Sequence, residues 1–495
     1  MQEPSEDRLT SPRWWPFWIA FAAALALRLV WLDNRPLHHD EGVNGWFLHR
    51  LLDGYRWEYD PEKFHGPFLY FFGAPFVLLL GMGEIALRLP VALASAAMIP
   101  LLLPLRRRLG SEGVTAAAWL LAVSPSLVYY GRDLIHETYL VALTLALIAA
   151  AVRWLEERRG RDLILAALAL SLLFSVKETA ALTLASLLLG ALAAWLAEGR
   201  GRPLPLAGEG RGVVFLLALV LVVPYVLLYT SFFTNPAGLV DSFRAYLPWT
   251  EKGFEGSGHE KPWPYFLRLL ARFEPLALAG GVLGSAVAIL RRHRRDGFGL
   301  FVAVAWMAQL AAYSAIPYKT PWLAMNVVLL LALSTGVLFG ELGRRRPSGA
   351  VRAAITAAGL LAVAWSASRA VDVSFLRYDD EGLGLVYVQT NRDLRGLMAL
   401  IQGAAERSPR GRALAIRFYT GNRWPLPWYL RDYTAVLYSN EVPRDPGGDV
   451  LICEPGQEQE LRQRLRGRYL RRQYTLRHKV ELVVYVSARV WPFSA

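Results

Sequence analysis

The sequence predicts a polytopic α-helical membrane protein with a small α/β domain after its last apolar segment. Of the 495 residues 54% are hydrophobic, only 19% are charged, and long apolar segments recur along the chain. Soluble proteins carry about 25% charged residues. The single cysteine, Cys453, excludes a disulfide scaffold and a cysteine-built zinc or iron–sulfur site. The basic residues behind the net charge of +13 alternate with apolar segments, so they indicate topology and exclude a continuous nucleic-acid groove.

Eleven apolar segments approach the length of roughly 17–25 residues that a bilayer-spanning helix needs. A twelfth stretch, 67–82, is short, and we interpret it as an interfacial or re-entrant helix, which keeps the loop before it on the same side as the other acid-bearing loops. The first segment has no small-residue cleavage site and is expected to stay as an anchor. The eleven lie at about 14–32, 86–105, 112–130, 134–152, 162–176, 179–197, 213–233, 275–290, 297–316, 321–340 and 350–370.

Arginine clusters follow every second span and define the expected orientation. The positive-inside rule assigns such clusters to the cytoplasmic side. We therefore expect about 11 spans in a plasma membrane, a cytoplasmic N-terminus that carries Arg8 and Arg13, and an extracytoplasmic C-terminal domain. The clusters lie at 106–108, 153–161, 200–211, 291–295 and 344–346.

Two domains are expected: residues 1–370 in the membrane, with a first outer loop at about 33–85, and residues 371–495 outside it. The second part alternates strand-like and helix-like patterns, which is typical of a small α/β domain. Strands are predicted at 383–389, 412–419, 449–453, 469–476 and 481–486, and helices at 392–406 and 457–466.

Ionisable residues at or near membrane depth are costly, so they are candidates for function. The run His38-His39-Asp40-Glu41 follows the first span. An adjacent pair of carboxylates facing a membrane cavity can act as a general base or hold a cation. The alternative is that Asp40 and Glu41 are solvated loop acids that cap a helix over 41–52.

Asp133, His136 and Glu137 lie between two spans at spacings i, i+3 and i+4. On a helix these positions share one face, which could ligate a divalent metal or bind sugar hydroxyls. The alternative is an ordinary interfacial turn with Asp133 as helix N-cap.

Two lysines in predicted outer loops complete the candidates. Lys177, beside Glu178, is either half of a neutralised pair or a phosphate contact. Lys319 lies between Pro317 and Pro321, where a broken helix exposes backbone N–H groups for a phosphate; the alternative is a lysine that reaches lipid headgroups. Because all these loops are predicted on one side, we expect Asp40, Glu41, Lys177 and Lys319 to share a pocket for an anionic lipid carrier.

Seven motifs give the chain a family resemblance. It resembles the GT-C membrane glycosyltransferases, the superfamily of protein O-mannosyltransferases and aminoarabinose transferases, and more closely the branch of flippase-activity-associated glycosylation proteins. The motifs are HHDEGVNGWFLHRLLDG (38–54), YDPEKFHGPFLY (59–70), SPSLVYYGRDLIHETYL (124–140), SVKET (175–179), PYKTPWL (317–323), VYVQTNRDLRGL (386–397) and WPLPWYLRDY (424–433).

The resemblance implies a GT-C-like fold with interfacial helices in the first outer loop. It also implies transfer of a sugar, with inversion, from a polyprenyl-phosphate-linked donor to a glycan, lipid or protein acceptor on the outer face. Asp40 matches the position proposed in the family as general base. His65-Gly66-Pro67 corresponds to a His-Pro-Pro-like or Lys-Pro-Pro-like element, with glycine for the first proline, and His65 would donate to a phosphate oxygen.

The resemblance also suggests roles for the remaining polar residues. Fixed cations would stabilise the charge that grows on the leaving lipid phosphate, and carboxylates would orient the sugar or hold Mg²⁺ or Mn²⁺, a requirement that the resemblance leaves open. The phosphate-binding candidates are His65, Arg132, Lys177, Lys319, Tyr318 and Trp322. The candidate contacts to sugar or acceptor are Asp133, Glu178, Trp424 and Trp428; alternatively, the two tryptophans are core residues. The metal candidates are Glu41, Asp133, His136 and Glu137.

Two other functions compete with a glycosyltransferase. The first is a flippase-associated or transport protein that binds polyprenyl phosphate without transferase chemistry. Transporters often show paired internal repeats with broken helices, and the motifs of this chain do not recur. The second is a structural partner in an envelope complex.

Overall fold

A computed structural model of the chain describes residues 9, 11–55, 57–63, 65–198, 211–254, 258–290 and 297–491. Contacts divide the chain into two compact units. Unit 1 comprises Met1–Leu32 and Gly54–Leu376, and unit 2 comprises Asp33–Asp53 and Arg377–Ala495. Arg8 and the predicted cytoplasmic clusters at 200–202 and 291–295 lie outside the described residues.

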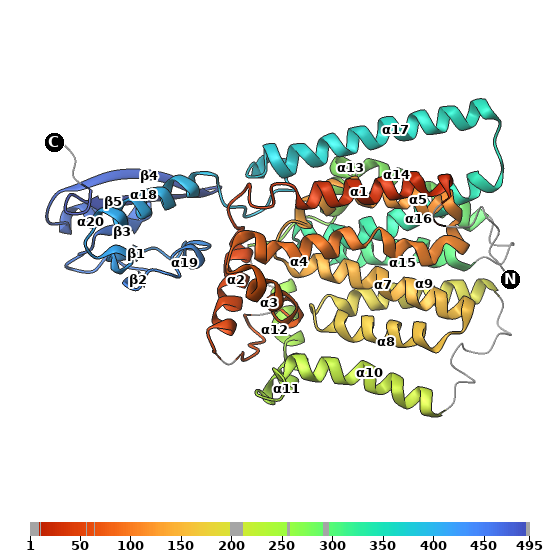
Figure 1. The fold of residues 1–495 in the computed structure, drawn as a ribbon, viewed down its shortest axis with the longest axis horizontal. Coiled ribbons are helices and arrows are strands. Elements are labelled where there is room, and N and C mark those ends of the chain that lie inside the picture. The colour runs from red at the N-terminus through yellow and green to blue at the C-terminus, as the bar shows by residue number, and fades with distance from the viewer. Residues whose placement is uncertain are drawn as a thin grey trace. The chain divides into compact units, whose positions relative to one another are not determined.

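Unit 1 is helical, and its long helices run side by side (Figure 1). Each of the eleven predicted apolar segments corresponds to a helix or to consecutive helices. The elements are α1 (Trp15–Leu29), α3 (Phe68–Leu80), α4 (Glu84–Ala97), α5 (Arg106–Val123), α6 (Pro125–Tyr130), α7 (His136–Glu157), α8 (Gly160–Phe174), α9 (Ala180–Glu198), α10 (Arg211–Tyr229), α11 (Ala237–Arg244), α12 (Tyr246–Phe254), α13 (Tyr265–Phe273), α14 (Pro275–Leu290), α15 (Gly297–Ala315), α16 (Ala324–Arg344) and α17 (Gly349–Val371).

Length and composition make unit 1 a multi-pass membrane unit. Among the described residues, 7 helical stretches are long and apolar enough to cross a bilayer, or 8 if the bent pair α13–α14 is one span. α16 is apolar on all sides and packs against α5, α14 and α15, so it forms the centre of the bundle. The predicted class of polytopic α-helical protein is confirmed, whereas the total of about 11 spans stays a prediction.

The two ends of unit 1 differ in charge. α7 has 22 residues, which corresponds to about 33 Å of helix. At its C-terminal end Glu156 accepts from Arg108 at 2.6 Å, and Arg344 in turn donates to the Arg108 carbonyl. At its N-terminal end lie His136 and Glu137. Within unit 1 the basic clusters at 106–108, 153–161 and 344–346 therefore lie at the end opposite His136 and Glu137; which end faces the cytoplasm stays a prediction.

Unit 2 holds a five-stranded sheet in the order β2-β1-β3-β5-β4, with β2, β1 and β3 parallel and β5 antiparallel to its neighbours. Successive side chains of β3 face opposite sides, so Ile452 packs with α18 residues and Leu451 with Leu461 of α20. The sheet lies between the two helices (Figure 1). The elements are α2 (His39–Leu52), α18 (Asp393–Arg407), β1 (Ile416–Tyr419), α19 (Leu426–Tyr429), β2 (Val436–Ser439), β3 (Val450–Cys453), α20 (Pro455–Arg464), β4 (Tyr469–Arg477) and β5 (Val480–Ser487).

The predicted small C-terminal α/β domain is confirmed, but one of its predicted strands is wrong. Residues 383–389 form no strand: a 3₁₀ turn at Glu381–Leu383 leads into irregular backbone in which Val388 has φ +53°. The reason is that this segment bonds to residues 36–38 of the first loop, through the Tyr387 carbonyl and the Gln389 side chain, and not to a neighbouring strand. From the sequence alone that loop is expected to belong with residues 1–370; contacts group its residues 33–53 with unit 2.

Candidate functional site

A buried polar cluster in unit 1 is centred on Glu178, in the loop between α8 and α9. One carboxylate oxygen contacts Nδ1 of His65 at 2.7 Å, and the other accepts a hydrogen bond from the Tyr59 hydroxyl at 3.3 Å. Burial raises the pKa of the Glu178 carboxyl, and nearby Lys177 opposes that shift. The motif around His65 and the motif around Glu178 thus meet in space, although about 110 residues separate them.

Aromatic rings enclose His65. Trp249 of α12 stacks on it with ring centroids 4.2 Å apart and an interplanar angle of 30°. His136, the first residue of α7, lies edge-on at 5.3 Å. The side chain of His65 keeps 22% of its surface exposed, so it is the most accessible polar group of this cluster, as a group that meets a substrate must be.

Lys177 forms a buried ion pair with Glu137. The two carboxylate oxygens lie 3.2 and 3.1 Å from Nζ, and the side chains are 10% and 2% exposed. The sequence predicts that Lys177 is either a phosphate contact or half of a neutralised pair with its neighbour Glu178. That pairing is wrong, because Lys177 turns toward α7 while Glu178 turns toward His65 and Tyr59.

Close backbone approach explains the glycine in the His-Gly-Pro element. A Cβ on Gly66 would lie 2.1 Å from the Ser175 carbonyl oxygen. Two residues later, Phe68 N donates to the same oxygen at 3.0 Å. A side chain at position 66 would therefore separate the two motifs, and glycine keeps His65 within reach of Glu178.

The first testable prediction follows from this approach. Gly66→Ala is expected to destabilise the protein by about 1–3 kcal/mol, because the added methyl group must displace backbone. The measurement is the melting temperature of the purified protein in detergent. Gly83→Ala, just before α4, is the matched control, since an added Cβ there meets nothing within 4 Å. Equal melting of the two variants would contradict the argument.

Lys319 lies in the loop before α16 and is also buried, at 1% exposed. Its ammonium group donates to the backbone carbonyls of Ile316 and Lys261. The loop reaches the cluster through α12: Tyr318 N donates to the Gly253 carbonyl one turn after Trp249. Lys319 thus lies at the same end of unit 1 as Lys177, but carbonyl oxygens hold its charge.

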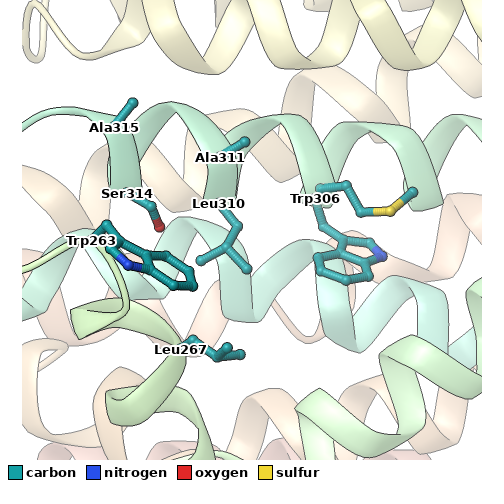
Figure 2. A pocket seen from close by; sticks show the side chains of 8 residues that line it. Trp263, Leu267, Trp306, Leu310, Ala311, Ser314 and Ala315 are labelled. Carbon is teal, nitrogen blue, oxygen red and sulfur yellow. The ribbon is translucent and has the colours of Figure 1, made fainter.

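An apolar groove of about 470 Å³ runs beside this loop, between α13 and α15. Trp263 and Trp306 flank it, and Leu310 projects between them (Figure 2). The groove ends at Ala315, four residues before Lys319. Its lining is Trp263, Leu267, Trp306, Met307, Leu310, Ala311, Ser314 and Ala315.

Arg132 lies apart from the cluster. The Arg132 guanidinium donates to four carbonyls at the C-terminal end of α1, among them Val30 at 2.8 Å, and packs over Phe375. A cation in that place stabilises the end of a helix. The predicted shared helix face is wrong, because α7 begins only at His136 and Asp133 belongs to the preceding turn.

In unit 2, the two acids of the first loop have different surroundings. Glu41 is fully buried and accepts from His38 N at 2.8 Å, which forms a capping box at the start of α2. Asp40 is partly exposed, and within the described ranges no hydrogen bond engages its carboxylate. Burial lowers the pKa of Arg477, and the charge of Asp40 opposes that shift, so the two groups feel one another.

The aromatic candidates also differ in how far they are buried. Trp428 is 3% exposed and packs edge-on against Tyr429, as its core alternative expects. Trp424 is partly exposed, and its carbonyl accepts from Arg477. In unit 1, Trp322 packs edge-on against Tyr130 at 5.8 Å. Tyr318 contacts the ring of His259.

Three groups escaped the sequence analysis. Tyr59 lies six residues before His65 in the motif 59–70, so the sequence held a signal for it. Nothing in the sequence connects Trp249 with His65. Glu274, at the 108° bend between α13 and α14, accepts from Ser124 and Ser126 and links α13–α14 to α6. Within the described ranges no group of three or more His, Cys, Asp or Glu side chains is arranged to hold a metal such as Mg²⁺ or Mn²⁺.

Comparison with known proteins yields the class of the molecule. Residues 64–228 match the family model described as dolichyl-phosphate-mannose-protein mannosyltransferase. No curated protein matches the chain. The crystal structure of ArnT from Cupriavidus metallidurans bound to undecaprenyl phosphate superposes with a TM-score of 0.67 at 18% identity, covering 96% of this chain and 99% of ArnT. The apo state of the same ArnT gives a TM-score of 0.66 at 18% identity, covering 96% and 98%.

The protein is therefore a multi-pass membrane protein with the GT-C glycosyltransferase fold. More particularly, its chain has the ArnT-like arrangement over nearly its whole length. The resemblance inferred from the motifs is confirmed at this level, and the closer likeness to the flippase-activity-associated branch stays a prediction.

Proposed function

We propose that the protein is an integral-membrane glycosyltransferase of the inverting type. It transfers a sugar from a polyprenyl-phosphate-linked donor to a glycan, lipid or protein acceptor on the outer face of the plasma membrane. The observation that supports this most strongly is the buried cluster of His65, Glu178, Lys177 and Glu137 in a bundle with the GT-C fold. Two basic and two acidic groups buried together at the ends of apolar helices are a costly arrangement that function explains.

The chemistry needs a proton acceptor and a stabiliser of the leaving group. The acceptor hydroxyl attacks the anomeric carbon, the bond from that carbon to the phosphate oxygen breaks, and the hydroxyl proton passes to Asp40. Negative charge grows on the departing lipid phosphate. His65 and Lys177 stabilise it, and they act strongly because water is largely excluded around them.

The apolar groove between α13 and α15 has the chemistry for the lipid part of the donor. Its lining is apolar apart from Ser314, and one end adjoins the loop of Lys319. A polyprenyl chain has no polar group to satisfy, so such a groove suits it. The similar ArnT binds undecaprenyl phosphate in its crystal structure, and we propose a carrier of the same chemical class here.

The testing experiment uses the purified full chain in detergent or vesicles. Radiolabelled polyprenyl-phosphate sugars are offered singly, with membrane acceptors, with and without chelator. We expect at least one donor to lose its sugar to acceptor or to water. Binding of polyprenyl phosphate without release of sugar from any donor would instead favour the lipid-binding protein, and absence of both would overturn the proposal.

A further inference from the structure

Side chains from the C-terminal part of unit 2 form hydrogen bonds to the backbone of the first loop at almost every residue from Asp33 to the start of α2. Arg395 of α18 donates to the Asp33 carbonyl at 2.9 Å and to the Arg35 carbonyl at 3.4 Å. Gln389 donates to the Pro36 carbonyl at 3.1 Å. Leu37 N donates to the Tyr429 hydroxyl at 2.9 Å. Three side chains from two distant motifs therefore fix Asp33, Arg35, Pro36 and Leu37 of one loop.

The next residue, His38, joins that loop to the helix that carries Asp40. Nδ1 of His38 accepts from Asp40 N at 3.0 Å. The other ring nitrogen, Nε2, must then carry the hydrogen and donate to the Tyr387 carbonyl at 2.7 Å. A neutral histidine with both nitrogens engaged thus connects the backbone of Asp40 to the irregular segment of unit 2.

The helix itself is packed as tightly as the loop. A Cβ on Gly42 would lie 2.3 Å from the Cβ of Pro425, just before α19. Gln389, Thr390 and Leu37 are each at most 1% exposed. Hydrogen bonds and close packing therefore leave the N-terminus of α2 little freedom to shift.

From these contacts we infer that the C-terminal part of unit 2, which begins at Arg377, positions Asp40, with Gln389, Arg395 and Tyr429 as positioning residues. The inference rests on the proposed function, because it gives Asp40 the part of general base. It goes further by assigning a task to the C-terminal domain and to the motifs 386–397 and 424–433. These motifs act through the backbone of the loop and touch no reacting atom.

The physical reason is that the carboxylate has only the long-range charge of Arg477 to orient it among the described residues. Within the described ranges no hydrogen bond fixes the Asp40 side chain, so its place depends on the backbone that carries it. A misplacement of about 1 Å of a reacting group can cost about 100-fold in rate. Loosening the loop should therefore slow the chemical step without changing how the donor binds.

The test compares Tyr429→Phe, Gln389→Met and their double variant with wild type. Each single change removes one hydrogen bond to the loop and keeps the size of the side chain. We expect kcat to fall about tenfold for the singles and about 100-fold for the double, with the donor KM within twofold. Arg395→Lys retains a donor and should lose less than Arg395→Met. Tyr433→Phe, on the same segment, is the matched control and should behave as wild type.

Hydrogen–deuterium exchange of residues 33–41 provides a second readout that needs no activity. Faster exchange there together with the fall in kcat supports the inference. Faster exchange with unchanged kcat, or a parallel loss of kcat, KM and melting temperature, would overturn the positioning role. If wild type transfers no sugar but the variants exchange faster, the proposed function fails and the anchoring stands; unchanged exchange overturns the anchoring itself.

Discussion

Asp40→Asn is expected to abolish sugar transfer while the protein still folds and still binds polyprenyl phosphate. A positioned general base contributes about 10²–10⁴-fold to a rate. Asparagine has nearly the same shape but cannot accept the proton at neutral pH. The bond from Asp40 N to His38 is a backbone contact, so it survives the change. Single-turnover release of radiolabelled sugar from the donor measures the effect.

The matched control is Asp53→Asn, at the other end of α2. The Asp53 carboxylate is 54% exposed and lies 3.2 Å from His49, so it is an ordinary surface acid. This variant should transfer sugar at the wild-type rate. If Asp40→Asn also stays within about threefold of wild type, a loss far below that expected for a general base, Asp40 is not the base.

The helices and most strands follow from the sequence because their signals are local. An apolar run long enough for the bilayer must be helical to satisfy its backbone, and each predicted run is a helix. The hairpin of β4 and β5 is also signalled locally, because both strands are rich in Tyr, Val and Leu and lie next to one another in the sequence. The segment 383–389 has a strand-like composition, but its hydrogen-bond partners His38 and Pro36 lie about 350 residues away. Tertiary contacts overrode local preference there.

The candidate site was predictable in its residue types but not in its pairings. Membrane cost singles out Lys177, Glu178, Glu137 and Asp40 without any knowledge of the fold. Which acid meets which base depends on how helices far apart in sequence pack: Lys177 pairs with Glu137 and not with its neighbour Glu178, so that one of the two open interpretations is excluded. Asp40 and Glu41 belong to unit 2 and the two lysines to unit 1, so their common pocket stays a prediction.

Lys177→Met is expected to be the most destabilising single change in the cluster. Removing one partner of a buried ion pair leaves the other charged and desolvated, which costs about 3–5 kcal/mol. Glu137, at 2% exposed, has little access to water when the ammonium group is gone. The measurement is the melting temperature and the urea midpoint in detergent. Lys63→Met is the control: its side chain is 71% exposed, and water screens its pair with Asp60, so its loss should leave the melting temperature nearly unchanged.

The double variant Lys177→Met/Glu137→Leu separates stability from function. Replacing both charges with apolar groups of similar volume is often neutral or stabilising, so the double variant should regain most of the lost stability. If Lys177 only neutralises Glu137, transfer recovers with the fold. If Lys177 also stabilises the leaving phosphate, the refolded double variant stays about 100-fold slow, as when one such electrostatic contact is removed. A double variant that is stable and fully active would leave His65 as the side chain that meets the phosphate, because Lys319 already donates to carbonyls.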